Sequence, residues 1–337
     1  MAMHKIMNAP EQYVDDALKG ILSAYKSELK ALDGDQRVIV RAGEKRPGKV
    51  GVVTAGGSGH LPLFLGYVGE GMLDGCTVGN IFASPSAERM SKMICACDAG
   101  AGVLCVYGNY GGDVMNLGMA RDMVDFEGIK TAAVLGRDDV ASSPKETAEK
   151  RRGVAGIVFA YKVAGAAADL GMDLEEVTRV TQKALDNTRS MGVALTPCIQ
   201  PEIGRTTFTI AENEIEIGMG IHGEPGIETA KNMSACDIVK CIYKRLTADM
   251  PLQSGDEISV IINGLGATPL EELLITYGNL HEQLEHDNVS VFMPHIGEYA
   301  TSMDMAGMSI SILKLDEELK QLLSHPAHTP FYTPPRP

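Results

Sequence analysis

The chain has 337 residues, of which 45% are hydrophobic and 22% charged, and its formal net charge at pH 7 is −14. One hydrophobic core rarely serves a chain of this length, so two domains are expected. The acidic balance argues against nucleic acid or an anionic membrane as a partner, because a polyanion would be repelled.

The distribution of apolar residues and cysteines predicts a cytoplasmic protein. Residues 1–20 carry three acidic side chains and no long apolar run, so no signal peptide is expected. The most apolar stretch, residues 153–172, is interrupted by Lys162 and Asp169, which argues against a transmembrane helix. The seven cysteines are scattered through apolar segments, which suits a reducing compartment and predicts no metal site.

The N-terminal half alternates strand-like runs, glycine-rich turns and helical spacing. Strands are predicted at 49–54, 102–107 and 130–136, and helices at 10–32, 113–124, 156–170 and 173–190. The last helix begins at Asp173, with Glu176 three residues later, a capping pattern. This alternation favours a mostly parallel α/β sheet with its site at the carboxyl ends of the strands.

The pattern changes near residue 192. A hairpin is predicted from residues 206–210 and 214–217, followed by helices at 234–249 and 269–286 and strands at 257–262, 289–294 and 308–314. We therefore predict an α/β protein of two domains. Residues 1–190 form an α/β domain with glycine-rich substrate loops, and residues 191–337 form a mixed-sheet α+β domain. The tail from His325 to Pro337 is expected to be extended and able to pack back on the first domain.

Two glycine patterns resemble nucleotide-binding motifs without their structural context. Gly43 to Lys49 fits the start of a phosphate-binding loop, but Val50 follows and the segment leads into a strand. Gly218, Gly220 and Gly223 have the spacing of a dinucleotide fingerprint, but no helix follows them. Neither pattern predicts a nucleotide site on this chain.

Three glycine-rich loops remain as carriers of chemistry: residues 55–62 with His60, 108–113 with Asp113, and 218–226 with His222. A histidine presented among glycines can act as a base, a metal ligand or a nucleophile. Simpler interpretations stay open at this point. His60 could serve only to hydrogen-bond its loop, and Asp113 could be a helix N-cap.

The same loops resemble a known family. Gly-Gly-Ser-Gly-His at 56–60, Asn-Tyr-Gly-Gly-Asp at 109–113 and Gly-Met-Gly-Ile-His-Gly-Glu-Pro-Gly at 218–226 are similar to the dihydroxyacetone kinase K-domain family. Residues 151–155 and 265–270 extend the resemblance over nearly the whole chain. Because the chain ends after this domain, it resembles the separate subunit of the phosphotransferase-system-dependent enzyme.

The resemblance implies roles for the loop residues. His222 would attack a ketose carbonyl and hold the substrate as a hemiaminal, Asp113 would be the base on the hydroxyl to be phosphorylated, and His60 would hydrogen-bond the substrate and shuttle a proton. The remaining substrate-binding positions would be Gly57, Ser58, Gly59, Gly108 and Asn109.

The resemblance also implies partners. It places no cofactor on this chain and assigns ADP or ATP, with magnesium, to a helical nucleotide-binding partner subunit. A phosphohistidine carrier protein would rephosphorylate that subunit. A homodimer and a small ketose substrate are expected, and a related non-catalytic role is that of a ketose-sensing co-activator of a transcription factor.

Two positions depart from the dihydroxyacetone pattern of the family. Leu61 stands where that pattern has an acidic residue, and Gly108 stands where it usually has a lysine. Loss of a long cation is expected to leave space beside the substrate. The sequence therefore leaves open a larger ketose such as erythrulose.

Overall fold

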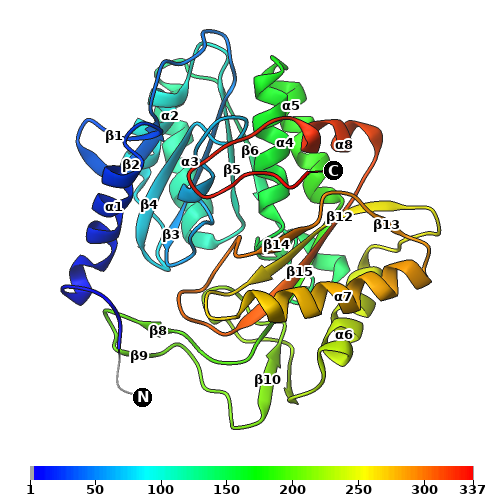
Figure 1. Ribbon diagram of the computed structural model, residues 1–337. Helices are drawn as coiled ribbons and strands as arrows, with labels where there is room; N and C mark the ends of the chain where they lie inside the picture. The colour runs from blue at the N-terminus through cyan, green and yellow to red at the C-terminus, as the bar shows by residue number, and fades with distance from the viewer. Residues whose placement is uncertain (1–3, 337) are drawn as a thin grey trace.

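Residues 4–336 are described by a computed structural model, in which two large β-sheets are separated by a layer of helices and β8 and β9 form a small third sheet (Figure 1). The elements up to residue 186 are η1 (Pro10–Gln12), α1 (Tyr13–Ala24), β1 (Leu29–Leu32), β2 (Asp35–Arg41), β3 (Gly51–Ser58), η2 (Leu65–Tyr67), β4 (Gly75–Ile81), α2 (Ala87–Cys97), β5 (Val103–Gly108), α3 (Gly111–Asp125), β6 (Thr131–Gly136), η3 (Lys145–Lys150), α4 (Ile157–Asp169) and α5 (Leu174–Asp186). The elements that follow are β7 (Thr188–Ala194), β8 (Ile199–Gln200), β9 (Arg205–Thr206), β10 (Glu214–Ile217), β11 (Glu228–Lys231), α6 (Ala235–Asp249), β12 (Glu257–Gly264), α7 (Leu270–His286), β13 (Ser290–Val291), β14 (His295–Gly297), β15 (Gly307–Lys314) and α8 (Glu317–Ser324).

The first sheet has the strand order β1-β2-β4-β3-β5-β6. Strands β4, β3, β5 and β6 pair in parallel, and β1 and β2 form an antiparallel edge. Alternate residues of its strands face α2 and α3 on one side and α1, α4 and α5 on the other. The predicted parallel α/β sheet is therefore confirmed.

The second sheet is mixed, as predicted, with the order β11-β10-β7-β15-β12-β13 and with β14 also paired to β12. Its outer face packs on α6 and α7, and its inner face shares a core with α4, α5 and α8. The domain boundary at residues 190 and 191 falls inside β7 and stays a prediction. The predicted ranges also include residues 1–3 and 337, which lie outside the described part of the chain.

Helix α4 lies between the two sheets, and every residue from Ile157 to Ala168 is buried. A helix that is apolar on all sides needs such a central position. Its one cation, Lys162, donates from Nζ to the carbonyl of Leu322 at 2.8 Å. Within residues 4–336, no helix has the length and apolar character that a membrane span requires.

Several predicted elements were wrong at their ends. The first helix ends at Ala24, and the last residues of its predicted range form β1 instead. Strand β1 turns back on β2 at Asp33 and Gly34, which both adopt positive φ. The helical spacing of the apolar residues concealed this Asp-Gly hairpin. The helix after Asp173 ends at Asp186, and residues 188–190 belong to β7. Strands β2 and β4 and helices α2 and α8 were not predicted.

The predicted hairpin of residues 206–217 does not exist. Strand β9 pairs with β8, whereas β10 pairs with β11 and β7. The alternation in residues 214–217 is real, but its partner lies after the His222 loop. The two strands that frame this loop are therefore neighbours in one sheet.

The C-terminal tail returns to the first sheet, where it lies beside the segment that follows His60 (Figure 1). The amide of His328 donates to the carbonyl of Glu70 at 2.9 Å, and Thr329 Oγ1 donates to the carbonyl of Gly66 at 2.6 Å. The Tyr332 ring packs against Tyr67. The tail thus holds the chain immediately after the His60 loop.

Candidate functional site

The three glycine-rich loops converge between the two sheets. His60 and Asp113 follow the parallel strands β3 and β5, and His222 lies in the loop between β10 and β11. The ring of His222 meets the ring of His60 edge-on, with centroids 4.7 Å apart, and the ring of Tyr110 at the same distance. Phe82 stacks on His60 at 4.8 Å. The two imidazoles therefore share one aromatic wall.

Glu224 fixes the orientation of His222. One carboxylate oxygen accepts from Nδ1 of the ring and the other accepts from the backbone N–H of His222, both at 3.0 Å. This leaves Nε2 of His222 as the ring nitrogen with a free lone pair. A Cβ on Gly220 would lie 2.1 Å from this carboxylate, so glycine is required there.

A partly buried ion pair between Arg152 and Glu224 lies behind the His222 loop. Nη1 of Arg152 lies 3.7 Å from the Glu224 carboxylate, and Nε of the same guanidinium donates to Asp139 at 2.9 Å. Burial raises the pKa of Glu224, but the hydrogen bond from His222 and the charges of His222 and Arg152 outweigh it and bring the pKa to about 2. The carboxylate is therefore ionised and ready to stabilise positive charge on His222.

His60 is buried and held in a single tautomer. Its Nδ1 is 2.8 Å from the carbonyl oxygen of Thr301, which can only accept, so Nδ1 carries the proton. Nε2 is buried and has no hydrogen-bond partner among the described residues. Burial and the neighbouring charge of His222 lower the pKa of His60 to about 3. The ring is thus a neutral acceptor.

Asp113 lies in the first turn of α3, where the N-cap position is taken by Tyr110. The alternative that Asp113 is an N-cap is therefore wrong. Its side chain is 5% exposed, and Oδ1 has no partner in residues 4–336. Burial raises the pKa of Asp113 to about 6, against the smaller lowering effects of Ser84 and His222. A carboxyl group in this range can work as a general base near neutral pH.

The other predicted substrate residues contribute mainly backbone. Ser58 donates its hydroxyl to the carbonyl of Gly79 at 2.9 Å, and Asn109 donates its amide to the carbonyl of Arg151 at 2.8 Å. Gly57 lies against the backbone of residues 82 and 83, and Gly59 has a φ of +99°. These positions shape the loops, and whether their N–H groups bind a substrate stays a prediction.

Gly108 does not leave the open space that the sequence predicted. A Cβ on this residue would lie 2.9 Å from the ring of Tyr110. That ring is held by a 3.0 Å hydrogen bond from its hydroxyl to the carbonyl of Gly153. Tyr110 therefore fills the volume beside Gly108 and forms part of the wall around His222.

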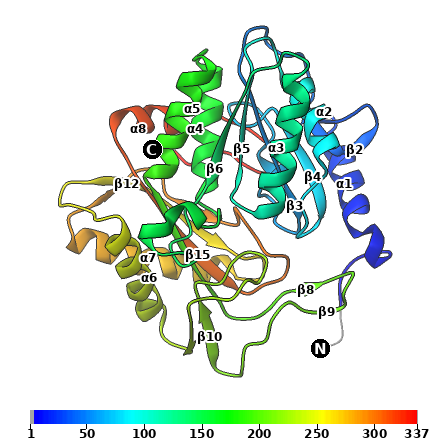
Figure 2. The ribbon, with the colours of Figure 1, turned by 180° about the vertical axis from the view of Figure 1, so that it is seen from behind.

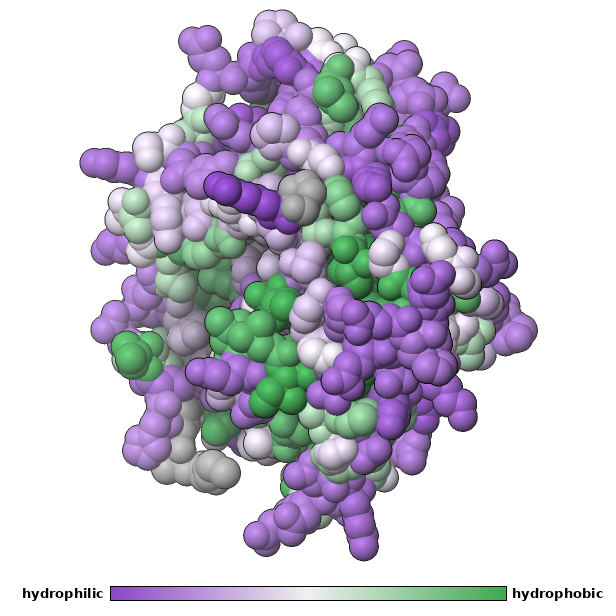
Figure 3. Space-filling view, turned by 45° about the vertical axis from the view of Figure 1, so that its right-hand side comes forward, coloured by the Kyte–Doolittle hydropathy of each residue, from purple (hydrophilic) through white to green (hydrophobic). Residues whose placement is uncertain are grey.

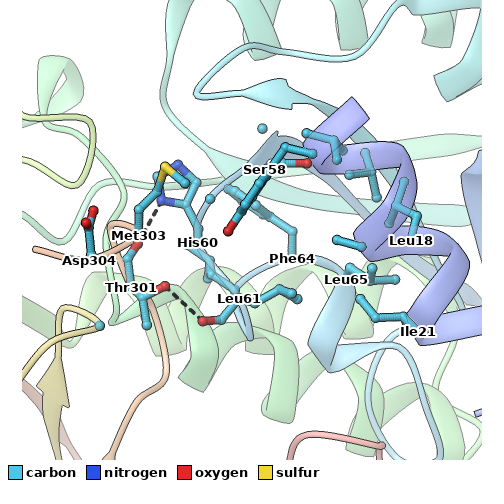
Figure 4. A pocket seen from close by; sticks show the side chains of 18 of the residues that line it. Leu18, Ile21, Ser58, His60, Leu61, Phe64, Leu65, Thr301, Met303 and Asp304 are labelled. Carbon is cyan, nitrogen blue, oxygen red and sulfur yellow. Dashed lines mark hydrogen bonds between the residues drawn. The ribbon is translucent and has the colours of Figure 1, made fainter. Parts of the chain in front are cut away.

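Leu61 faces a separate cavity of about 520 Å³ on the α1 side of the His60 loop (Figure 4). Leu18, Ile21 and Leu65 form its apolar wall, and Thr301 donates to the carbonyl of Leu61 at 2.9 Å. His60 borders this cavity, but Asp113 and His222 do not. The cavity and the cluster around His222 therefore lie on different sides of one loop.

Residues outside the predicted set complete the site. The sequence motif contained Glu224, but its role on His222 was missed, although a carboxylate two residues from a loop histidine was a usable signal. Tyr110, Phe82 and Arg152 were also missed. Lys49, the last residue of the Gly43–Lys49 pattern that resembles a phosphate-binding loop, forms an ion pair with Asp74 at 2.7 Å.

Comparisons with known proteins show similarity to one family and to its solved structures. The Dak1 domain family matches residues 19–331. A dihydroxyacetone-binding DhaK subunit of a PTS-dependent dihydroxyacetone kinase from Listeria innocua is 43% identical over 98% of this chain and 99% of its own. A D-erythrulose kinase from Mycolicibacterium smegmatis is 42% identical over 98% of this chain and 56% of its own length. The solved structure of the dihydroxyacetone kinase operon co-activator Dha-DhaQ has a TM-score of 0.87 at 29% identity, over 93% of this chain and 96% of its own.

Proposed function

The chain belongs to the Dak1 domain family, and we propose that it is the ketose-binding subunit of a phosphotransferase-system-dependent dihydroxyacetone kinase. The observation that carries this proposal is the orientation of His222. Glu224 accepts the Nδ1 proton of His222, which leaves Nε2 free to attack a carbonyl carbon, and the ring of His60 meets the ring of His222 edge-on.

Capture of the ketose is a reversible addition. Nε2 of His222 forms a bond to the carbonyl carbon, and the π pair of the C=O bond moves to oxygen, which takes up one proton from solvent. The ring then carries one positive charge, with its Nδ1 proton shared with the Glu224 carboxylate. This ion pair makes the hemiaminal less costly to form.

A covalent bond solves a problem of affinity. Dihydroxyacetone has about six heavy atoms, and roughly 1.5 kcal/mol per atom is an upper limit for noncovalent binding of very small ligands. A bond to the carbonyl adds affinity and excludes glycerol, which has no carbonyl. It also fixes the hydroxyl that is to be phosphorylated.

The residues around His222 then prepare that hydroxyl. Asp113 accepts its proton, and Nε2 of His60 accepts a hydrogen bond from the bound ketose. A nucleotide with magnesium on a helical partner subunit would supply the phosphoryl group. The transfer depends chiefly on positioning, which the covalent bond and the two loops provide.

The test follows a ketose labelled with carbon-13 at its carbonyl by NMR. Addition of the wild-type protein should move the label from the ketone range to that of a tetrahedral carbon. The His222→Ala variant should leave the ketone signal unchanged. An equal shift with both proteins would refute His222 as the nucleophile.

The choice of ketose has a second candidate. Gly108 and Leu61 depart from the dihydroxyacetone pattern, and a D-erythrulose kinase is 42% identical to this chain. An erythrulose-type kinase subunit therefore competes with the dihydroxyacetone enzyme. Parallel labelling with dihydroxyacetone and each erythrulose enantiomer separates them, because the preferred ketose should be captured at the lowest concentration.

A co-activator role is the alternative outside catalysis, since the Dha-DhaQ structure resembles this chain over most of its length. A sensor needs the covalent histidine but no base. Asp113, buried with an unpartnered oxygen beside the site, favours the kinase subunit. Ketose capture without phosphorylation by a nucleotide-bearing subunit would favour the sensor.

A further inference from the structure

The loop between β4 and α2, residues 82–86, forms a further wall of the site. Its first residue, Phe82, stacks on the His60 ring at 4.8 Å and meets the His222 ring edge-on at 5.3 Å. A Cβ on Gly57 would lie 2.7 Å from the backbone nitrogen of residue 83, so the His60 loop packs closely on this one. The 82–86 loop therefore contacts two of the three glycine-rich loops through its first two residues.

Phe82 has an unusual backbone conformation. Its φ is +56°, in the left-handed region that a bulky aromatic residue rarely adopts. Such conformations cost about 1–3 kcal/mol, persist where the surrounding structure imposes them, and cluster at functional sites. Here the amide of Phe82 donates to the carbonyl of Ser58 at 3.0 Å, and a Cβ on Gly59 would lie 2.8 Å from the Phe82 ring. The start of the 82–86 loop is thus held in one position.

The third residue of this loop, Ser84, faces the start of α3. Figure 2 shows α2 and α3 side by side on the near face of the first sheet, and the loop that leads into α2 contacts α3 at two points. A Cβ on Gly112 would lie 2.6 Å from Oγ of Ser84, and the carbonyl of Pro85 accepts from Nδ2 of Asn116 at 2.8 Å. From this position the Ser84 hydroxyl donates a hydrogen bond to the carboxyl group of Asp113.

The two oxygens of the Asp113 carboxyl group differ in their surroundings. Oδ1 is buried without a partner in the described part of the chain, so the hydrogen bond from Ser84 falls on Oδ2. The surface in Figure 3 is mostly hydrophilic, as expected for an acidic chain, and a serine there would be hydrated. Ser84 is half-buried instead, and its hydroxyl is directed to Asp113. One carboxyl oxygen is therefore held by the protein while the other is unused.

We propose that Ser84 is a positioning residue for Asp113, which holds Oδ2 and leaves Oδ1 to accept the proton of the ketose hydroxyl. The inference rests on the proposed function, in which Asp113 is the base. A general base must lie within hydrogen-bond reach of the proton that it removes, and small displacements of such a group slow the reaction. A carboxyl group fixed at one oxygen meets this requirement before the ketose arrives.

The other groups around Asp113 make the contribution of Ser84 measurable. Burial raises the pKa of Asp113, and the hydrogen bond from Ser84 and the charge of His222 lower it. Three further side chains that act on this carboxyl group are uncharged near neutral pH, because burial raises the pKa of each: Cys76 of β4, Tyr107 of β5 and Tyr161 of α4. Loss of the Ser84 hydroxyl should therefore appear directly in the titration of Asp113.

The test is a carbon-13 NMR titration of the Asp113 side chain in the ketose-free protein, with the signal assigned from Asp113→Asn. Ser84→Ala should raise the pKa of Asp113 by about one pH unit, because one hydrogen bond to the ionised form is lost. Ser84→Thr keeps a hydroxyl and should titrate as the wild type does. Ser86→Ala is the matched control in the same loop, because the exposed Ser86 caps α2 by accepting from the amide of Arg89.

Kinetics with the nucleotide-bearing subunit test the consequence for catalysis. Ser84→Ala should phosphorylate a saturating ketose roughly tenfold more slowly, with the acid limb of its pH profile moved up and ketose capture by His222 unchanged. Gly112→Ala places a methyl group against Oγ of Ser84 and should act in the same direction, whereas Gly118→Ala, with open space around it, should not. The double variant of Ser84→Ala and Gly112→Ala should be no slower than Ser84→Ala alone, because both changes break one contact.

An unchanged titration of Asp113 in Ser84→Ala would overturn the proposal. So would an equal change in Ser86→Ala, which would assign the effect to folding of the loop. Weaker ketose capture by Ser84→Ala with an unchanged titration would make Ser84 a substrate ligand and would also refute positioning. Failure of the proposed function has a different signature, since the wild-type protein would then show no ketose capture, while the titration, which needs no ketose, would still report on the contact between Ser84 and Asp113.

Discussion

Replacement of Glu224 by glutamine tests the orientation of His222 most directly. The carboxylate accepts two hydrogen bonds from His222, one from Nδ1 and one from the backbone N–H. Glutamine has nearly the same shape but only one acceptor oxygen. Its amide nitrogen must therefore face one of these two donors.

The expected effect follows from the change of charge. A hydrogen bond to an ionised partner contributes about 1.5–3 kcal/mol, whereas a neutral one contributes about 0.5–1.5 kcal/mol. The imidazolium formed on capture also loses its counter-charge. A loss of about 1.5–3 kcal/mol corresponds to a decrease of roughly 10- to 100-fold in ketose capture.

The assay is a titration of carbonyl-labelled ketose followed by NMR. Glu228→Gln is the matched control, because Glu228 lies in β11 and its carboxylate pairs with Arg245 at 3.0 Å, away from the ring of His222. Glu224→Gln should weaken capture and Glu228→Gln should not. Equal capture by both variants would show that the carboxylate does not activate His222.

Three further substitutions address the remaining site residues. Asp113→Asn should abolish phosphorylation while leaving capture intact, and wild-type turnover should decline below about pH 6, where Asp113 takes up a proton. Because folding raises the pKa of Asp113 from 3.8 to about 6, the stability of the wild type falls as pH rises through this range. In urea denaturation, Asp113→Asn should therefore be more stable than the wild type at pH 7.5, by up to about 3 kcal/mol. This gain should be absent at pH 4. His60→Asn keeps a donor for Thr301 but removes the free ring nitrogen, so single-turnover kinetics should show phosphorylation about 100-fold slower; an unchanged rate would exclude a proton-transfer role. Gly108→Ala should push the Tyr110 ring toward His222, and competition binding should show a larger loss for erythrulose than for dihydroxyacetone; equal losses would show that this wall does not select the ketose.

Local sequence signals predicted the framework of the site. Buried apolar runs marked β3, β5 and β6, and the glycines after β3 and β5 placed His60 and Asp113 at the carboxyl ends of parallel strands. The glycine run around His222 identified the third loop. These features are encoded within a few residues, so spacing was sufficient to find them.

The contacts that tune the site depend on the fold and could not be derived from spacing. Arg152 lies in the segment after β6 and contacts the loop between β10 and β11 through Glu224 at 3.7 Å and the carbonyl of Gly218 at 3.2 Å, contacts that only the fold brings about. Tyr110 covers Gly108 because its hydroxyl donates a hydrogen bond to the carbonyl of Gly153. The false hairpin of residues 206–217 has the same origin, since pairing with β11 outweighs a locally plausible turn.

The unsatisfied polar atoms of the site argue that a ligand belongs there. Nε2 of His60, in the loop after β3, and Oδ1 of Asp113, in the first turn of α3, are buried without a hydrogen-bond partner in residues 4–336. Each such group costs about 1–3 kcal/mol, a large part of a total stability of about 5–15 kcal/mol. Hydroxyl groups of a ketose held on His222 could donate to both atoms and recover this energy. The stability gained in Asp113→Asn at pH 7.5 would measure the cost of the buried charge alone, because asparagine keeps the acceptor oxygen.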